Sequence, residues 1–178
     1  AAQAAGSYVK ALSGHLTQES IEDDGETDSN TSSNVTMSDL QTLLIESLEA
    51  VGSWDAAYSE RSAALEGKSD PSKDELKALA TCAFSAKKHD RVIEICRRLL
   101  QEDPDDLDLH RQIAESADAI GDLDTAIVHY SQTIQIAPEQ AALWKGLVSV
   151  QNKAGLDTAA FESLRAASQA LPQDGEIQ

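Results

Sequence analysis

Aromatic residues and cysteines are scarce in this sequence. Phe, Trp and Tyr make up 4% of its 178 residues, and the two cysteines are Cys82 and Cys96. Two cysteines do not make a disulfide framework, so we expect both to be reduced. No apolar run approaches the roughly 20 residues that a membrane span needs, and no basic-then-apolar segment opens the sequence. The sequence therefore predicts a cytoplasmic protein, and its richness in Ala and Leu favours helices.

Basic residues are also few. The chain has 14 Lys and Arg against 31 Asp and Glu, which gives a net charge of −17. A surface this acidic repels phosphate, so neither nucleic acids nor anionic membranes are expected as partners. Residues 19–36 carry six of the acids and no base. Because this stretch has too few apolar residues to offset the entropy lost on ordering, residues 19–37 are predicted to be an acidic disordered linker.

What the sequence does contain is an internal repeat. Pro104, Pro138 and Pro172 are 34 residues apart, and Pro71 precedes Pro104 by 33. Aligned on these prolines, the chain divides into four units, 38–72, 73–106, 107–140 and 141–174. In the third unit, apolar residues recur at helical spacing on both sides of Gly121. Each unit is predicted to be a hairpin of two helices, because glycine readily ends a helix and proline cannot continue one.

The spacing of these units resembles the tetratricopeptide repeat. The fourth unit carries the motif at Trp144, Leu147, Ala160, Leu164 and Pro172. The second unit is degenerate, with Val92 and Cys96 in place of the small and the aromatic residue. The resemblance implies an all-α fold, a right-handed α-α superhelix of about four hairpins. Residues 1–18 are predicted to form a short amphipathic helix, as the second half of an upstream repeat would, and residues 175–178 to form a tail.

The resemblance also implies that the first helix of each unit lines a concave groove that binds a peptide or helix. Lys77, Arg111 and Lys145 occupy the same position of this helix in three successive units. The predicted groove adds seven polar residues to this row: Thr81, Asp108, Gln112, Glu115, Ser149, Asn152 and Lys153. Three bases in register in an acidic chain favour a partner of acidic character. The alternative is that Asp74 and Asp108 form i,i+3 ion pairs with Lys77 and Arg111 on solvated faces.

The row differs from the carboxylate clamp by which some tetratricopeptide proteins bind chaperone tails. Thr81 and Glu115 stand where that clamp has Asn, and Asp108 and Ala142 stand where it has a base. The acidic C-terminal tails of heat-shock chaperones are therefore not expected as ligands.

No group of residues in the sequence predicts catalysis. Cys82, His89 and Cys96 follow one another at intervals of seven. The predicted hairpin places His89 in the turn and each Cys about 10 Å away along its own helix, whereas zinc needs contacts near ~2 Å. His110 and His129 have no Ser or Cys partner at a recognisable spacing, and there is no glycine-rich phosphate loop. We therefore expect no enzymatic activity, no metal site and no cofactor.

The sequence leaves three functional hypotheses. The first is a non-enzymatic interaction module that binds a partner in the groove, within a larger scaffold or adaptor. The second is a structural scaffold segment that assembles, through its uncapped C-terminal hairpin, with further repeats or a second copy. Phe161, Leu164 and Leu171 would then form the interface. In the third, residues 1–36 occupy the groove as an internal ligand.

Overall fold

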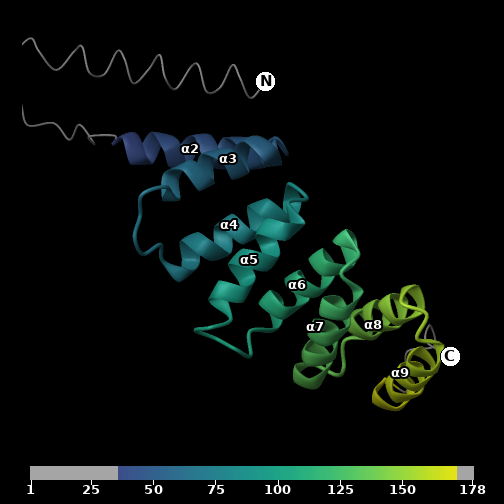
Figure 1. The fold of residues 1–178 in the computed structure, drawn as a ribbon. Helices are drawn as coiled ribbons and strands as arrows, with labels where there is room; N and C mark the ends of the chain where they lie inside the picture. The colour runs from purple at the N-terminus through teal and green to yellow at the C-terminus, as the bar shows by residue number, and fades with distance from the viewer. Residues whose placement is uncertain (1–35, 172–178) are drawn as a thin grey trace, which may run out of the picture. The chain divides into compact units, whose positions relative to one another are not determined.

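A computed structural model describes residues 36–171, which form eight helices and contain no strand. The predicted all-α helical-repeat fold is thus confirmed for this part of the chain. The helices labelled in Figure 1 are α2 (Met37–Ala50), α3 (Trp54–Leu65), α4 (Lys73–Ser85), α5 (His89–Leu99), α6 (Leu107–Ile120), α7 (Leu123–Ile136), α8 (Ala141–Lys153) and α9 (Asp157–Ala170). The predicted helix 1–18, most of the predicted linker and the tail 175–178 lie outside the described residues.

The described residues form two compact units, which divide between residues 69 and 70. In the first unit, α2 and α3 pack against each other as a hairpin, with Ala57 fully buried. Thr36 begins α2 with a reciprocal cap. Its hydroxyl accepts a hydrogen bond from the Asp39 backbone N–H at 3.2 Å, and the Asp39 carboxylate accepts one from the Thr36 N–H at 2.8 Å. Such a cap satisfies two backbone donors that the first turn otherwise leaves unpaired.

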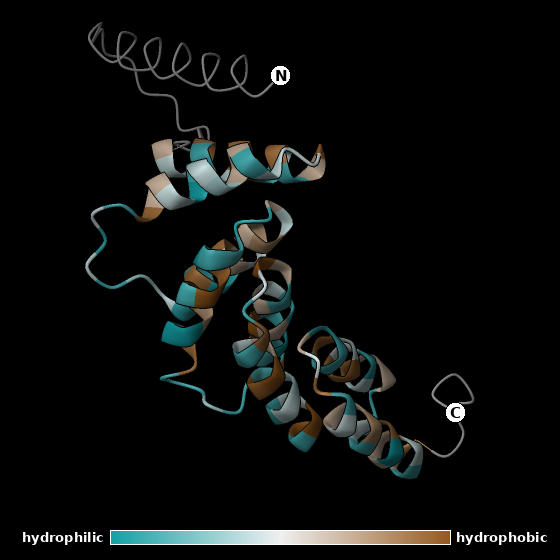
Figure 2. Cartoon of the chain, turned by 45° about the vertical axis from the view of Figure 1, so that its right-hand side comes forward, coloured by the Kyte–Doolittle hydropathy of each residue, from teal (hydrophilic) through white to brown (hydrophobic). Residues whose placement is uncertain are grey.

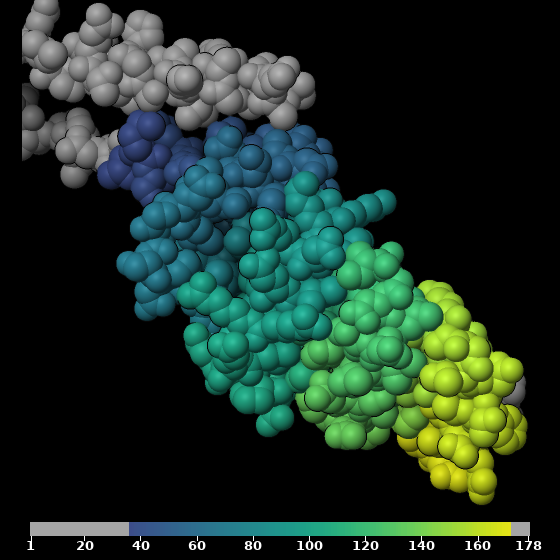
Figure 3. Space-filling view, in the orientation of Figure 1, coloured from purple at the N-terminus to yellow at the C-terminus, as the bar shows by residue number. Residues whose placement is uncertain are grey.

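In the second unit, each helix from α4 to α9 packs against the next one along the chain. The helices follow one another from teal to yellow in Figure 3. Each helix carries both hydrophobic and hydrophilic residues (Figure 2). Helix α6 also contacts α8, and its Ile113, Ala114 and Ala117 are fully buried. Small side chains at such positions allow neighbouring helices to approach closely.

The turns inside the hairpins show why the second one departs from the repeat pattern. Gly121 ends α6 with φ +83°, the left-handed conformation that glycine adopts without steric cost. Lys87 lies 34 residues earlier and adopts φ +57° at the corresponding turn. Among the described residues it is the one non-glycine with positive φ. The backbone of the second hairpin is therefore kept, although its sequence lacks the glycine that favours it.

Gly146 allows α8 to approach Tyr130 of α7 closely. A Cβ atom at this position would lie 2.6 Å from two ring carbons of Tyr130. Tyr130 is 7% exposed and lies in the middle of α7. The missing side chain of Gly146 is thus what makes room for the Tyr130 ring.

Candidate functional site

The ten residues predicted to line the groove lie on the first helices of three hairpins, and we call this set the first-helix face. Lys77 and Thr81 come from α4; Asp108, Arg111, Gln112 and Glu115 come from α6; Lys145, Ser149, Asn152 and Lys153 come from α8. None of the ten is buried, and Thr81, Ser149 and Asn152 are among the exposed ones. The face therefore presents hydrogen-bonding groups to solvent from three successive hairpins.

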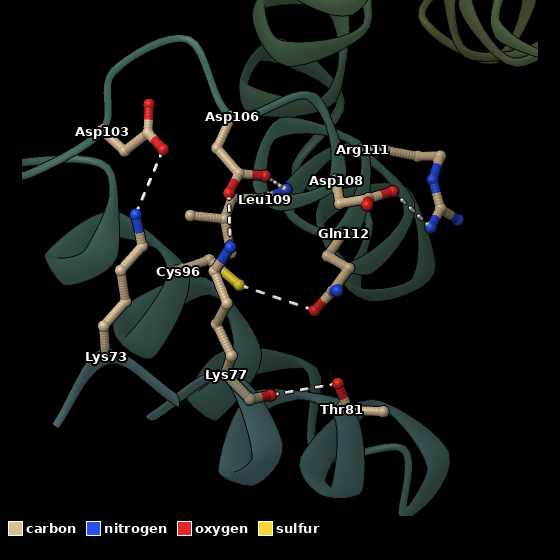
Figure 4. A network of polar contacts seen from close by, with 10 residues as sticks. All are labelled: Lys73, Lys77, Thr81, Cys96, Asp103, Asp106, Asp108, Leu109, Arg111 and Gln112. Carbon is tan, nitrogen blue, oxygen red and sulfur yellow. Dashed lines mark hydrogen bonds and ion pairs between the residues drawn. The ribbon is translucent and has the colours of Figure 1, made fainter. Parts of the chain in front are cut away.

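Lys77 is held by an ion pair between hairpins. Its Nζ lies 2.6 Å from Asp106 Oδ2, and Asp106 Oδ1 accepts a hydrogen bond from the Leu109 backbone N–H at 3.1 Å (Figure 4). Asp106 thus caps α6 and pairs with α4 at the same time. The hydrogen bond to Asp106 raises the pKa of Lys77. Burial raises the pKa of Asp106, but the bonds from Lys77 and Leu109 outweigh it and leave that pKa below its usual value.

Arg111 forms its ion pairs within its own helix. Its guanidinium lies 3.2 Å from Asp108 Oδ1 and 3.1 Å from Glu115 Oε1. Burial lowers the pKa of Arg111, but the two carboxylates more than compensate, so the pKa is raised. Of the two i,i+3 pairs considered from the sequence, the Asp108 pair forms. The expected pair of Lys77 with Asp74 was wrong, because Lys77 pairs with Asp106 instead.

Other residues of the face also have polar partners. Lys153 Nζ lies 2.6 Å from Asp118 Oδ1, an ion pair from α8 to α6. The Thr81 hydroxyl donates to the Lys77 carbonyl at 3.0 Å, and the Cys96 thiol donates to Gln112 Oε1 at 3.7 Å. An acidic ligand on this face would therefore have to exchange with carboxylates that already hold Lys77, Arg111 and Lys153.

The structure brings together two histidines that no sequence motif connects. His110 Nδ1 lies 2.8 Å from His129 Nδ1, and His110 Nε2 lies 2.7 Å from the Pro104 carbonyl oxygen. The signal that could have found them is the repeat itself. Trp144 occupies the position of His110 one unit later, and its indole N–H donates to the Pro138 carbonyl at 2.8 Å.

The bond between His110 and the Pro104 carbonyl fixes the tautomers of the two rings. His110 Nε2 must carry hydrogen to bond a carbonyl, so in neutral His110 the Nδ1 atom accepts. His129 Nδ1 must then donate. Burial, together with the charges of His110 and Arg97, lowers the pKa of His129 to about 4.

The described part of the chain offers few side chains that could bind a metal ion together. Cys82 and Cys96 are buried free thiols on α4 and α5, and burial raises the pKa of Cys96 to about 12. Within residues 36–171 no group of three or more His, Cys, Asp or Glu side chains could hold a metal ion. None of the helices in the same range is long and apolar enough to cross a membrane.

Residues 83–149, from the end of α4 through most of α8, match the family model described as tetratricopeptide repeat. Residues 83–149 carry tetratricopeptide repeats. The resemblance read from the prolines and from the Trp144 motif is therefore confirmed for these residues. No curated protein sequence is significantly similar to the chain.

Solved tetratricopeptide structures share the fold at low sequence identity. The MamA structure designated MSR-1 C2 is 13% identical, with a TM-score of 0.66 over 94% of this chain and 92% of that one. MamA from Desulfovibrio magneticus RS-1 is 11% identical, with a TM-score of 0.64 over 76% of each chain. YrrB, described as a TPR protein with an unusual peptide-binding site, is 14% identical, with a TM-score of 0.65 over 81% of this chain and 73% of that one. At these identities the likeness establishes the fold.

Proposed function

We propose that this protein is a non-enzymatic interaction module that binds a peptide or helix of a partner protein along the first-helix face. Tetratricopeptide chains are in general protein-interaction modules, and the neighbour YrrB has a peptide-binding site. The observation that carries the proposal is that all ten residues of the face remain accessible on α4, α6 and α8. Lys77, Arg111 and Lys145 give this face its preference for acidic partners.

The ion pairs of the face shape how such a ligand would bind. A ligand carboxylate at Arg111 would replace Asp108, whose side chain is 75% exposed and so leaves easily. At Lys77 it would have to compete with Asp106, which is tied to the start of α6. We therefore expect Arg111 to be a stronger ligand contact than Lys77, with hydrogen bonds from Thr81 and Ser149 adding directionality.

A peptide display library selected on the full chain tests the proposal. Thr81→Tyr with Ser149→Tyr fills the face without disturbing its ion pairs, and should reduce binding of the selected peptides at least tenfold. Gln132→Tyr with Gln135→Tyr is the matched control, because both residues are exposed on α7, the second helix of its hairpin. Equal binding by both double variants would refute the proposal, provided that circular dichroism shows unchanged helicity.

A second candidate function is assembly through the C-terminal hairpin. Leu164 occupies the position of Tyr130 and Cys96, which lie 34 and 68 residues earlier and are 7% and 0% exposed. Leu164 itself is 37% exposed, and Phe161 on the same helix is 68% exposed. A further repeat or a second copy that covers this face would bury both side chains.

Sedimentation equilibrium separates this candidate from groove binding. If the face of α9 is the interface, the wild-type chain associates as its concentration rises, and Leu164→Glu abolishes association without changing peptide binding. A monomer at the highest concentration reached would rule out self-assembly through α9.

A further inference from the structure

A cleft of about 480 Å³ lies between the outer side of α5 and the turn that joins α6 to α7. It involves the second helix of one hairpin and the turn of the next, so none of the ten residues of the first-helix face lines it. Arg97 and Arg98, in the last turn of α5, form one end of this α5 cleft. Ile120, the last residue of α6, contributes an aliphatic wall and is 44% exposed.

The two arginines of the α5 cleft differ from the bases of the first-helix face. Lys77, Arg111 and Lys153 each have a carboxylate oxygen within 3.2 Å. In residues 36–171, by contrast, no hydrogen bond or ion pair joins Arg97 or Arg98 to another side chain. A ligand carboxylate could therefore bind them without displacing an acid of the protein.

The acids that also line the cleft form no ion pair with these arginines in residues 36–171, although the pKa of Asp122 is lowered by hydrogen bonds from Thr125 and also by the charge of Arg97. Glu94 pairs with Arg91 at 2.7 Å. Asp122 caps α7 by accepting a hydrogen bond from the Thr125 backbone N–H at 3.2 Å. Asp90 lies seven residues before Arg97 on α5, about 10 Å away along the helix axis. Within the described residues, both guanidinium groups thus have no bound carboxylate, although Asp122 lies close enough to Arg97 for their charges to interact.

The repeat pattern does not account for these features. One unit further along the chain, Ser131 and Gln132 stand where α5 has Arg97 and Arg98, and Ala154 stands in the place of Ile120. Packing of the hairpins is maintained there without two arginines or an exposed isoleucine. The basic end and its aliphatic wall are thus local to the α5 cleft.

We propose that the α5 cleft is a second protein-binding site, which takes an acidic peptide segment of a partner. Carboxylates of the peptide pair with Arg97 and Arg98, whose planar guanidinium groups bind carboxylates in bidentate fashion. An aliphatic side chain next to them covers Ile120. The site is independent of the proposed function of the first-helix face, and its two arginines concentrate positive charge in a chain whose net charge is −17.

Fluorescence polarisation with two labelled peptides tests this site on the full chain. The probe is Gly-Glu-Leu-Glu-Asp-Leu-Gly, and its comparison peptide has Gln and Asn in place of the acids. We expect the acidic probe to bind, the amide peptide to bind at least tenfold more weakly, and added salt to weaken binding of the acidic probe. Absence of binding by the acidic probe, or equal binding of the two peptides, would overturn the proposal.

Two double variants locate the site. Arg97→Glu with Arg98→Glu should weaken binding of the acidic probe at least tenfold. The control is Lys68→Glu with Arg165→Glu, which changes the net charge equally at exposed positions outside the cleft. An equal loss in both double variants would mean general repulsion and would refute the site.

A third double variant distinguishes the cleft from the first-helix face. Thr81→Tyr with Ser149→Tyr should leave binding of the acidic probe unchanged. If this variant abolishes binding while the Arg97 and Arg98 variant does not, the probe binds the first-helix face. The α5 cleft is then wrong and the proposed function stands.

Discussion

The contact between His110 and His129 predicts a specific loss of stability in mild acid. The two rings share one hydrogen bond between Nδ1 atoms 2.8 Å apart, and His110 donates its other hydrogen to Pro104. A proton that His129 takes up goes to Nε2, because Nδ1 already donates to His110, and burial makes the resulting charged ring unfavourable. Arg97 on α5 adds a further positive charge near His129.

The sign and size of the effect follow from the pKa of His129. Its pKa is about 4 in the folded protein, against 6.5 for a free histidine. Because the unfolded chain binds the proton more tightly, stability is complete above pH 6.5 and is lost as pH falls toward 4. A difference of 2.5 units corresponds to about 3.4 kcal/mol. Since His129 is half-buried, solvent screening reduces this to about 1.5 kcal/mol, of which about 1 kcal/mol is lost by pH 5.

Urea unfolding at pH 7.5 and pH 5 measures this loss. His129→Asn keeps an amide N–H close to the place of Nδ1 but cannot take up a proton, so its stability should change about 1 kcal/mol less between the two pH values. His15→Asn is the control, since it removes a histidine that lies outside the described residues. If His129→Asn shows the same pH dependence as the wild type, the reasoning on this pair is refuted.

Three further predictions concern packing, backbone strain and thiol chemistry. Gly146→Ala should lower the free energy of unfolding by about 1 kcal/mol, because overpacking against Tyr130 outweighs the gain in helix propensity. Lys87→Gly should raise it by about 1 kcal/mol by removing a non-glycine from positive φ. Cys82 and Cys96, 1% and 0% exposed, should resist Ellman's reagent at pH 8 until urea unfolds the chain.

Each of these has its own control and a contrary result. The control for Gly146→Ala is Ser149→Ala, because Ser149 is exposed on the same helix. If Gly146→Ala instead stabilises the protein, the Tyr130 ring moves away freely and the overpacking argument is wrong. Lys88→Gly changes a residue with negative φ, −89°, and should not stabilise. Thiols that react at once in the native protein would contradict the burial of Cys82 and Cys96.

The fold was predictable because its signals are local. Gly121 directly follows α6, Pro138 lies two residues after the end of α7, and Pro104 lies in the loop between α5 and α6. Their period therefore identifies the hairpins without knowledge of any contact. The positive φ of Lys87 was not predictable in this way, because lysine disfavours that backbone conformation and only the tertiary packing imposes it. Such an override of local preference leaves no trace in the sequence.

The details of the site depend on contacts between helices, which the sequence alone does not specify. The pair of Lys77 with Asp106 joins residues 29 apart, and a nearer acid, Asp74, was the natural candidate from helical spacing. The pair of His110 with His129 joins the two helices of one hairpin. Both depend on helix rotation, which a one-dimensional pattern leaves open.

The central claim, that the first-helix face binds a partner peptide, is tested most directly by amide chemical shifts. A library-selected peptide would be titrated into the isotope-labelled full chain. Binding on this face predicts the largest shifts at Thr81, Ser149 and Asn152, on α4 and α8. Shifts confined to α9, or to the α5 cleft, with those three amides unmoved, would contradict the claim.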